Sequence, residues 1–221
     1  MSQVKERKIT QIEKPSSRTK RYNVYVDGEC LLSVHEDVLV KYRLHKGMEI
    51  DEKEIHALLE AEEYNKAKQV ALRYLSYSPR TVQELKSYLN RKGYDGGNTE
   101  RVIHELEKLG FLNDLEYAKA WVEERKRHKG YGKKRLRQEL LKKGIALLIV
   151  DGILADMDDD EQRRLAISIA ERRYSRICGE PWPKIERRLG NYLVRQGYSM
   201  SIVYEVLHLF RIRYEEEKGN E

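Results

Sequence analysis

Three stretches of the chain repeat one another at a spacing of about fifty residues, and this repeat limits the possible folds more than any other feature. Superimposing Gly93, Gly144 and Gly197, which are 51 and 53 residues apart, brings leucines into register eight and four residues before each glycine. These leucines are Leu85, Leu136 and Leu189 at the first position and Leu89, Leu140 and Leu193 at the second. Apolar residues four apart lie on one helix face, and a period of this length is typical of stacked helical modules. The sequence therefore predicts a mostly α fold, an elongated tandem array of three-helix modules.

The first repeat shows how each module is expected to begin and end its helices. Thr81 and Glu84 form the T-x-x-E pattern of a capping box, which predicts a helix start. Gly93 follows the last apolar residue of that helix, where a left-handed cap is needed. Gly110 ends a second helix, and a longer third helix opens at Asn113.

The later repeats predict the same order with small departures. In the middle repeat the third helix follows Asp158–Glu161, whose carboxylates are expected to stabilise the helix N-terminus rather than to bind a metal. The last module is expected to end after two helices, near Tyr214. Its link contains the stretch Gly179–Pro183, in which Trp182 is expected to pack against the array rather than to contact a partner.

The N-terminal stretch has a different pattern, which predicts a small β element. Asp27-Gly28 is flanked by Arg21–Val26 and Glu29–Val34, a strong hairpin signal. Further strands are expected at Ile9–Ile12 and Met48–Ile50, with a helix near Val38–Tyr42. We therefore expect four segments: a β-hairpin-containing extension at 1–50, a linking helix and first module core at 51–112, the third helix of the first module with the second module at 113–160, and the last helices with the third module at 161–221.

No arrangement of residues typical of catalysis is found in the sequence. The six histidines show no H-x-x-x-H or H-E-x-x-H spacing, and there is no phosphate-binding glycine loop or nucleophile elbow. The pair Gly96-Gly97 is isolated and predicts a turn. Cys30 and Cys178 are far apart and are expected to be reduced, partly buried thiols. We expect a protein that is not an enzyme and needs no cofactor or metal.

Charge is distributed unevenly along the chain, although the formal total is only +6. The segment Lys119–Lys143 carries a net charge of +8 and Arg163–Arg195 a net charge of +6, whereas Glu49–Glu63 carries −6. Opposite poles on one chain indicate a polyanionic partner on one side. No run approaches the roughly 18 apolar residues that a membrane span needs, so a soluble, cytoplasmic protein is expected.

Two basic regions supply the candidate binding residues. The segment Arg125–Arg137 has a Gly-Tyr-Gly centre, which allows the backbone to approach a phosphate or a partner surface closely. Tyr131 is placed to stack on a base, and an ordinary exposed turn tyrosine is the alternative. Salt bridges to nearby glutamates are the alternative for about half of the cations. The candidates for contact with a partner or DNA are Arg125, Lys126, Arg127, Lys129, Tyr131, Lys133, Lys134, Arg135, Arg137, Lys142, Lys143, Arg172, Arg173, Arg176, Arg187, Arg188 and Arg195.

The repeat and three further motifs together resemble the RecX family of bacterial regulators. The motifs are the L-x-x-[YE]-L-x-[RK]-[KQ]-G repeat, Arg73–Arg80, Gly110–Ala118 and Lys129–Leu136. The resemblance covers about Tyr64 to Tyr214, and the N-terminal β element resembles the extension of the longer, Gram-positive-type members. It implies a concave array that lodges in the groove of RecA filaments on single-stranded DNA. It also implies lower recombinase, ATPase and co-protease activity, and thereby a role in DNA repair, homologous recombination and the SOS response, although some members act positively.

Two functions from different classes follow as hypotheses. The first is a monomeric regulator that recognises the RecA filament on single-stranded DNA, with double-stranded DNA as a further target. The second is a general nucleic-acid-binding helical protein that acts on DNA or RNA alone. Tighter binding to RecA-coated than to bare single strands separates the first from the second. An enzyme with an unrecognised site is a third and weaker hypothesis.

Overall fold

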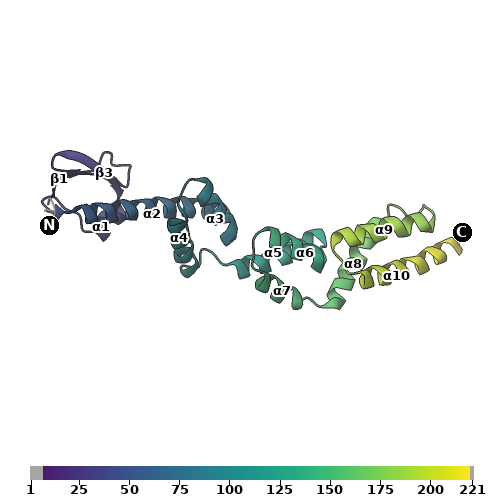
Figure 1. The fold of residues 1–221 in the computed structure, drawn as a ribbon. Helices are drawn as coiled ribbons and strands as arrows, with labels where there is room; N and C mark the ends of the chain where they lie inside the picture. Colours follow the sequence, from purple (N-terminus) through teal and green to yellow (C-terminus); the bar gives the residue numbers. More distant parts are fainter. Residues whose placement is uncertain (1–6, 220–221) are drawn as a thin grey trace. The chain divides into compact units, whose positions relative to one another are not determined.

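Residues 7–219 are the part of the chain that the computed structural model describes, and within them the fold has ten helices and one four-stranded sheet (Figure 1). These residues form two compact units. The first comprises the described chain up to Pro79 and Leu85–Leu112, and the second comprises Arg80–Glu84 and the described chain from Asn113 onward. The predicted mostly helical fold with a small N-terminal β element is confirmed. The expected division into four segments stays a prediction.

The N-terminal sheet is antiparallel, with the strand order β3-β2-β1-β4. Its strands are β1 (Arg7–Glu13), β2 (Arg21–Val26), β3 (Glu29–His35) and β4 (Glu49–Ile50). The predicted hairpin joins β2 to β3 through Asp27 and Gly28. Their φ angles of 53° and 88° are the two positive values that a tight hairpin turn requires. Both further strands that the sequence predicts are present, as β1 and β4.

Helices α1 (Glu36–Lys41) and α2 (Glu52–Tyr77) pack against this sheet, and α1 lies where the sequence predicts a helix. Sheet and helices share a core of Ile9, Val24, Val26, Leu32, Val34, Val38, Leu44, Ile50 and Leu58. The buried carboxylate of Glu62 on α2 accepts a hydrogen bond from the backbone N–H of His35 at 2.8 Å and pairs with Arg21 at 2.6 Å. An isolated hairpin is only marginally stable in water, so these contacts stabilise the β element.

The remaining helices are α3 (Val82–Arg91), α4 (Gly96–Lys108), α5 (Asp114–Lys129), α6 (Lys133–Lys142), α7 (Leu147–Ala155), α8 (Asp159–Tyr174), α9 (Trp182–Gln196) and α10 (Met200–Gly219). The predicted capping box opens α3, since Thr81 and Glu84 exchange two hydrogen bonds of 3.1 Å. The turn expected at Gly96-Gly97 is wrong, because both glycines lie in the first turn of α4. The Asp95 carboxylate accepts a hydrogen bond from the Asn98 N–H at 2.8 Å and so starts that helix before them.

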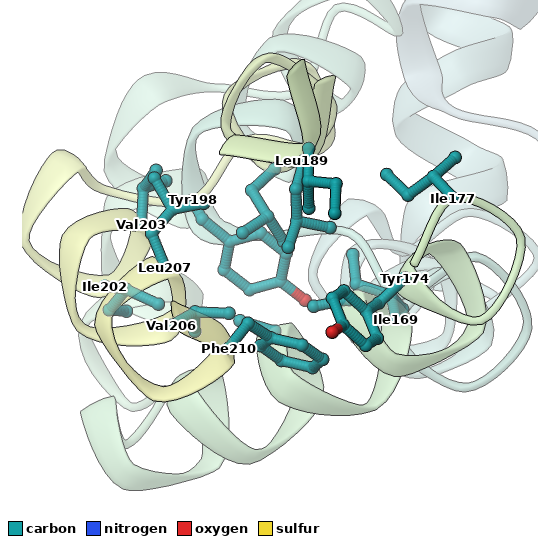
Figure 2. Packing of buried hydrophobic residues seen from close by; sticks show 14 residues of the cluster. Ile169, Tyr174, Ile177, Leu189, Tyr198, Ile202, Val203, Val206, Leu207 and Phe210 are labelled. Atoms are coloured by element: carbon teal, nitrogen blue, oxygen red, sulfur yellow. The ribbon is translucent and has the colours of Figure 1, made fainter. Parts of the chain in front are cut away.

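The second unit contains two hydrophobic cores. Helices α5, α6 and α7 share one of them, and α8, α9 and α10 share the other, in which Tyr174, Tyr198 and Phe210 lie among aliphatic side chains (Figure 2). The long helix of each group is therefore its first member, whereas the repeat predicts it as the last. The period of a repeat does not show where each three-helix group begins. The beginning of a group depends on which helices bury their apolar surfaces together.

The repeat itself is confirmed residue by residue. All six leucines that it brings into register are completely buried. Gly93, Gly144 and Gly197 have φ angles of 89°, 79° and 93°, the left-handed conformation that a helix cap favours. The last helix continues to Gly219, beyond the end expected near Tyr214, because its final turns are held by ion pairs such as Arg213 to Glu217 at 2.8 Å.

Two single-residue expectations have different outcomes. Trp182 is partly buried and packs against the core of the last three helices, with its ring centroid 5.7 Å from that of Tyr214, as expected. The expectation of partly buried thiols is wrong, because Cys30 and Cys178 are both exposed free cysteines.

Candidate nucleic-acid interface

Several of the candidate cations are held by carboxylates inside the second unit. Lys126 is buried and binds Glu161 at 2.7 Å and Glu123 at 3.0 Å. Burial lowers the pKa of Lys126, but the hydrogen bonds that its ammonium donates to Glu161 and Glu123 outweigh burial, so the net shift is upward. Arg125 pairs with Glu139 at 3.3 Å and lies over the Trp121 ring. These two side chains therefore act first as internal contacts.

The same holds for four further candidates, each of which pairs with an acid on another helix or in a linking turn. The pairs are Lys133 with Asp159, Arg137 with Asp151, Lys143 with Glu84, and Arg188 with Glu180. For about half of the cations, the sequence leaves open the alternative that they form salt bridges with nearby glutamates. These four cations do form salt bridges with acids of the chain.

The Gly-Tyr-Gly turn does allow a close backbone approach, but to the chain itself. The N–H of Gly132 donates to the carbonyl oxygen of Gln196 at 2.8 Å, and the N–H of Lys134 donates to that of Gly197 at 3.1 Å. A Cβ atom on Gly132 would lie 2.6 Å from the Gly197 oxygen. In this structure the backbone of the turn therefore approaches the α9–α10 turn, and not the phosphate or partner surface that the sequence suggests. We call this contact between the α5–α6 and α9–α10 turns a joint.

A contact of the same kind occurs once more in the second unit, one repeat earlier. Thr81 and Lys143 stand at the repeat positions of Gly132 and Gln196, and the Thr81 hydroxyl donates to the Lys143 carbonyl oxygen at 2.7 Å. The side chains correspond as well. Lys143 pairs with Glu84 at 2.8 Å, and at the equivalent positions Arg135 donates to the Gln196 side-chain oxygen at 3.1 Å.

Beside the joint of Gly132 with Gln196 lies a hollow of about 360 Å³, which we call the cationic hollow. It is lined by His128, Lys129, Tyr131, Arg135, Ile169, Arg172, Arg173, Arg176, Tyr192 and Gln196. The lining takes residues from the end of α5, the α5–α6 turn and α6, and from α8, the segment after it and α9. No carboxylate stands among these lining residues. Six of the candidate residues are thus brought together, namely Lys129, Tyr131, Arg135, Arg172, Arg173 and Arg176.

The cations of the hollow differ in how they are held. Arg135 lies over the Tyr131 ring at 3.9 Å and donates to the backbone oxygen of Arg195 at 3.2 Å. The Nε atom of Arg173 is buried and has no hydrogen-bond partner among the described residues, and its guanidinium lies 5.7 Å from the centre of the Tyr192 ring. The side chains of three further cations make no ion pair with another described residue: Lys129, Arg172 and Arg176.

The other candidates do not join this hollow. Arg127, Lys134, Lys142, Arg187 and Arg195 are exposed on the second unit outside the lining. Sequence reasoning missed Tyr192 and Gln196, whose spacing of four residues on one predicted helix places them on one face. The spacing shows that these two side chains share a helix face, but nothing in the sequence shows that this face lies against Arg173.

A second hollow, in the first unit, has a different chemical character. It measures about 290 Å³ and lies between α1, α2 and α4. Its charged lining residues are Asp37, Lys41, Glu60, Lys68, Arg101 and Glu105. Lys68 and Tyr64 already bind the Glu105 carboxylate there. Burial and this hydrogen bond raise the pKa of Tyr64 to about 12. Balanced charge makes this hollow a weaker candidate for a polyanion.

Within residues 7–219, no group of three or more histidine, cysteine, aspartate or glutamate side chains is placed to hold a metal ion. None of the helices in that range combines the length and the apolar character that crossing a membrane requires.

Four family models match successive parts of the chain. They describe the regulatory protein RecX N-terminal domain at residues 7–51 and the first, second and third three-helix domains of RecX at 67–106, 113–151 and 159–207. The second and third matches begin with the long helix, as the two hydrophobic cores of the second unit do.

Known proteins and solved structures are similar over most of the chain. The regulatory protein RecX of Clostridium tetani is 33% identical over 203 residues, which cover 91% of this chain and 93% of that protein. The regulatory protein RecX of Bacillus pumilus is 32% identical over 213 residues, which cover 96% of this chain and 81% of that protein. A crystal structure of regulatory protein RecX superimposes with a TM-score of 0.79 at 32% identity, covering 91% of this chain and 98% of that one. The crystal structure of RecX from Lactobacillus salivarius superimposes with a TM-score of 0.64 at 25% identity, and the match covers 69% of this chain and 99% of that one.

Proposed function

We propose that this chain, which belongs to the RecX family of regulatory proteins, binds RecA filaments on single-stranded DNA and lowers their recombinase, ATPase and co-protease activity. Family membership rests on the four matching family models and on relatives at least 30% identical over nine tenths of the chain. The family's regulatory role supports a protein that acts by binding, without a catalytic step of its own. We further propose that it acts as a monomer in the cytoplasm.

The cationic hollow is the observation that carries the nucleic-acid part of this proposal. It gathers cations from two three-helix domains in one place without a carboxylate among its lining residues. Cationic surfaces of this kind bind phosphates and release counterions, which makes the binding depend on salt. The seventeen candidate residues of the two basic regions are proposed as the wider contact surface, with the cations that are already paired contributing less.

The experiment that tests the proposal is the single-stranded-DNA-dependent ATPase of the cognate RecA. The protein is added at less than one copy per recombinase, with an excess of bare single-stranded DNA as competitor. Loss of ATPase activity at that ratio supports recognition of the filament, because the competitor removes any protein that binds only DNA. Increased ATPase activity at that ratio would still support recognition of the filament, but it would make the protein an activator of RecA and not an inhibitor.

The alternative is a general nucleic-acid-binding protein, and the same experiment includes its outcome. Equal affinity for RecA-coated and bare single strands, with unchanged ATPase activity, would replace the proposal with that alternative. The comparison uses the full chain, so that both described units and the residues beyond them are present in each measurement.

A further inference from the structure

We infer that the cationic hollow is a phosphate-binding site and that its ligand is a phosphodiester of single-stranded nucleic acid. The inference rests on the proposed function and deepens it, because it names the part of a nucleoprotein filament that this hollow contacts. It also separates the residues of this site from the many other cations of the second unit.

The first argument is the scarcity of compensating charge. Five cationic side chains border about 360 Å³, and the lining contains no carboxylate. Of the five, only Arg135 has an acid partner among the described residues, Glu139 at 3.9 Å. Elsewhere in the second unit, cations such as Lys126 and Lys143 lie within 3 Å of an acid. Like charges held together repel one another, so an anion in the hollow would relieve that repulsion. The five side chains are Lys129, Arg135, Arg172, Arg173 and Arg176.

Helix ends explain only part of this cluster. Lys129 lies in the last turn of α5, and Arg172 and Arg173 lie in the last turn of α8, where cations complement the negative end of a helix. That effect acts on each helix separately. It does not bring two such ends to one hollow, and it does not account for Arg176, which follows the end of α8.

The second argument is an unused donor. The Nε–H of Arg173 is buried without a partner among the described residues, which is costly for a polar group. A shift of this partly buried side chain toward a bound phosphate would relieve that cost. The planar guanidinium presents forked donors that match the oxygen atoms of a phosphate. Arg172 and Arg176 have exposed side chains with no acid partner among the described residues, so they are free to neutralise the same group.

The third argument favours a single strand over a duplex. Tyr131 and Tyr192 stand among the cations of the hollow. Sites for single-stranded nucleic acid combine a cationic track with aromatic side chains on which unpaired bases stack, and a duplex keeps its bases stacked inside. The Arg135 guanidinium lies 3.9 Å from the centre of the Tyr131 ring, whereas the Arg173 guanidinium lies 5.7 Å from the centre of the Tyr192 ring. We therefore assign Tyr192, the less closely covered ring, to the base next to the bound phosphate.

The hollow is also preformed. Its two walls come from the second and third three-helix domains, and the backbone hydrogen bonds of Gly132 and Lys134 join those walls. A site whose walls are already fixed loses little freedom on binding, which favours affinity. A bound phosphodiester would bridge the two domains at this joint.

The test compares two arginines of the same helix in the full chain. Arg173→Gln removes a cation of the hollow, and Arg164→Gln removes an exposed cation of α8 outside it. Binding of a fluorescent oligothymidylate is measured by anisotropy across a range of salt concentrations. We expect Arg173→Gln to weaken binding about tenfold and to reduce the slope of log affinity against log salt by about 0.7, with Arg164→Gln unchanged.

Arg176→Gln serves as a second variant, because its exposed side chain contributes little to folding, and it should show the same direction of change. Thermal unfolding of each variant shows whether it is folded. If Arg173→Gln and Arg164→Gln changed the affinity for oligothymidylate equally, the assignment of the hollow as the binding site would be overturned. An equal loss for a duplex of the same length would overturn the assignment to a single strand. Pyrophosphate binding that is lost in Arg173→Gln, with oligothymidylate binding unchanged in the same variant, would reassign the hollow to free phosphates.

Failure of this inference is distinguishable from failure of the proposed function. If Arg173→Gln binds bare oligothymidylate normally but no longer inhibits the RecA ATPase, the occupant is an acidic protein surface. The inference then falls and the proposed function stands. If Arg173→Gln loses oligothymidylate binding while the unmodified protein leaves the ATPase unchanged, the inference stands and the proposed function falls.

Discussion

The hydroxyl of Tyr198 donates a hydrogen bond of 3.0 Å to the carbonyl oxygen of Gly130, and both residues are buried. One residue follows the glycine cap of α9, and the other is the glycine cap of α5. The bond therefore ties the turn after the first helix of the second three-helix domain to the turn after the second helix of the third. Together with the backbone bonds of Gly132 and Lys134, it makes this joint polar as well as close-packed.

Replacing Tyr198 by phenylalanine should destabilise the second unit by about 1–3 kcal/mol, because it leaves the buried Gly130 oxygen without its donor. Chemical denaturation followed by circular dichroism measures the free energy of unfolding. Tyr204→Phe is the matched control, since the Tyr204 side chain is 65% exposed. A Tyr198→Phe variant as stable as the control would mean that the hydroxyl finds equally good partners in the unfolded chain.

Alkaline pH should destabilise the same unit. Burial raises the pKa of Tyr198, and burial followed by the hydrogen bond to Glu217 raises the pKa of Tyr174 to about 12. A raised pKa in the folded state means that stability is fully present below the ordinary tyrosine value of 10.0. It is then lost as pH rises toward the folded value, because only the unfolded state releases its protons.

Melting temperatures between pH 9 and pH 12, with tyrosinate absorbance recorded in parallel, check this expectation. Tyr174→Phe should flatten the decline by removing one of the two groups. A decline that is identical in that variant would mean that Tyr174 makes no contribution to the alkaline transition.

Gly132→Ala should cost more than about 2 kcal/mol of stability. The added Cβ would meet backbone atoms of Gly197 and Tyr198 at 2.6–2.8 Å, and backbone cannot move aside as a flexible side chain does. Gly152→Ala makes the same chemical change inside α7, where nothing lies within 4 Å. That variant should gain roughly 0.5–1 kcal/mol from helix propensity. Two changes of the same sign would contradict the close approach.

Lys143→Met should destabilise the second unit by about 1 kcal/mol, because it removes the partner of the mostly buried Glu84 carboxylate and keeps the apolar stem over Trp121. Lys142→Met, at an exposed neighbouring position, is expected to have almost no effect. The difference between the two variants in thermal unfolding is the measured quantity. It should persist at high salt, since the Lys143 and Glu84 side chains are only 20% and 25% exposed.

Local signals predict much of this fold from the sequence. Leu136 and Leu140 are predicted to be buried because their spacing matches the helical period, and they are. Asp27 and Gly28 predict the hairpin because few residues adopt the two positive φ angles that it needs. In each case a few neighbouring residues contain the whole physical cause.

The candidate site is predicted less completely, because it depends on contacts between distant segments. Nothing near Lys126 shows that Glu161 will bind it, and nothing near Gly132 shows that the turn after α9 will lie against it. The same applies to Arg173 and Tyr192, which meet only after α8 and α9 pack. The sequence predicts which residues are cationic, and the tertiary structure decides which of them remain unpaired.

The two contacts at Lys143 and Gln196 differ in polarity, and this has a consequence for how such a protein can evolve by duplication. Glu84 and Arg135 occupy the same repeat position, as do Lys143 and Gln196. If a gene acquired a second copy of the middle repeat, the Arg135 of one copy would face the Lys143 of the next, and the added joint would bring two cations together. The repeats are therefore not interchangeable parts. A longer protein would require a compensating substitution at one of these two positions.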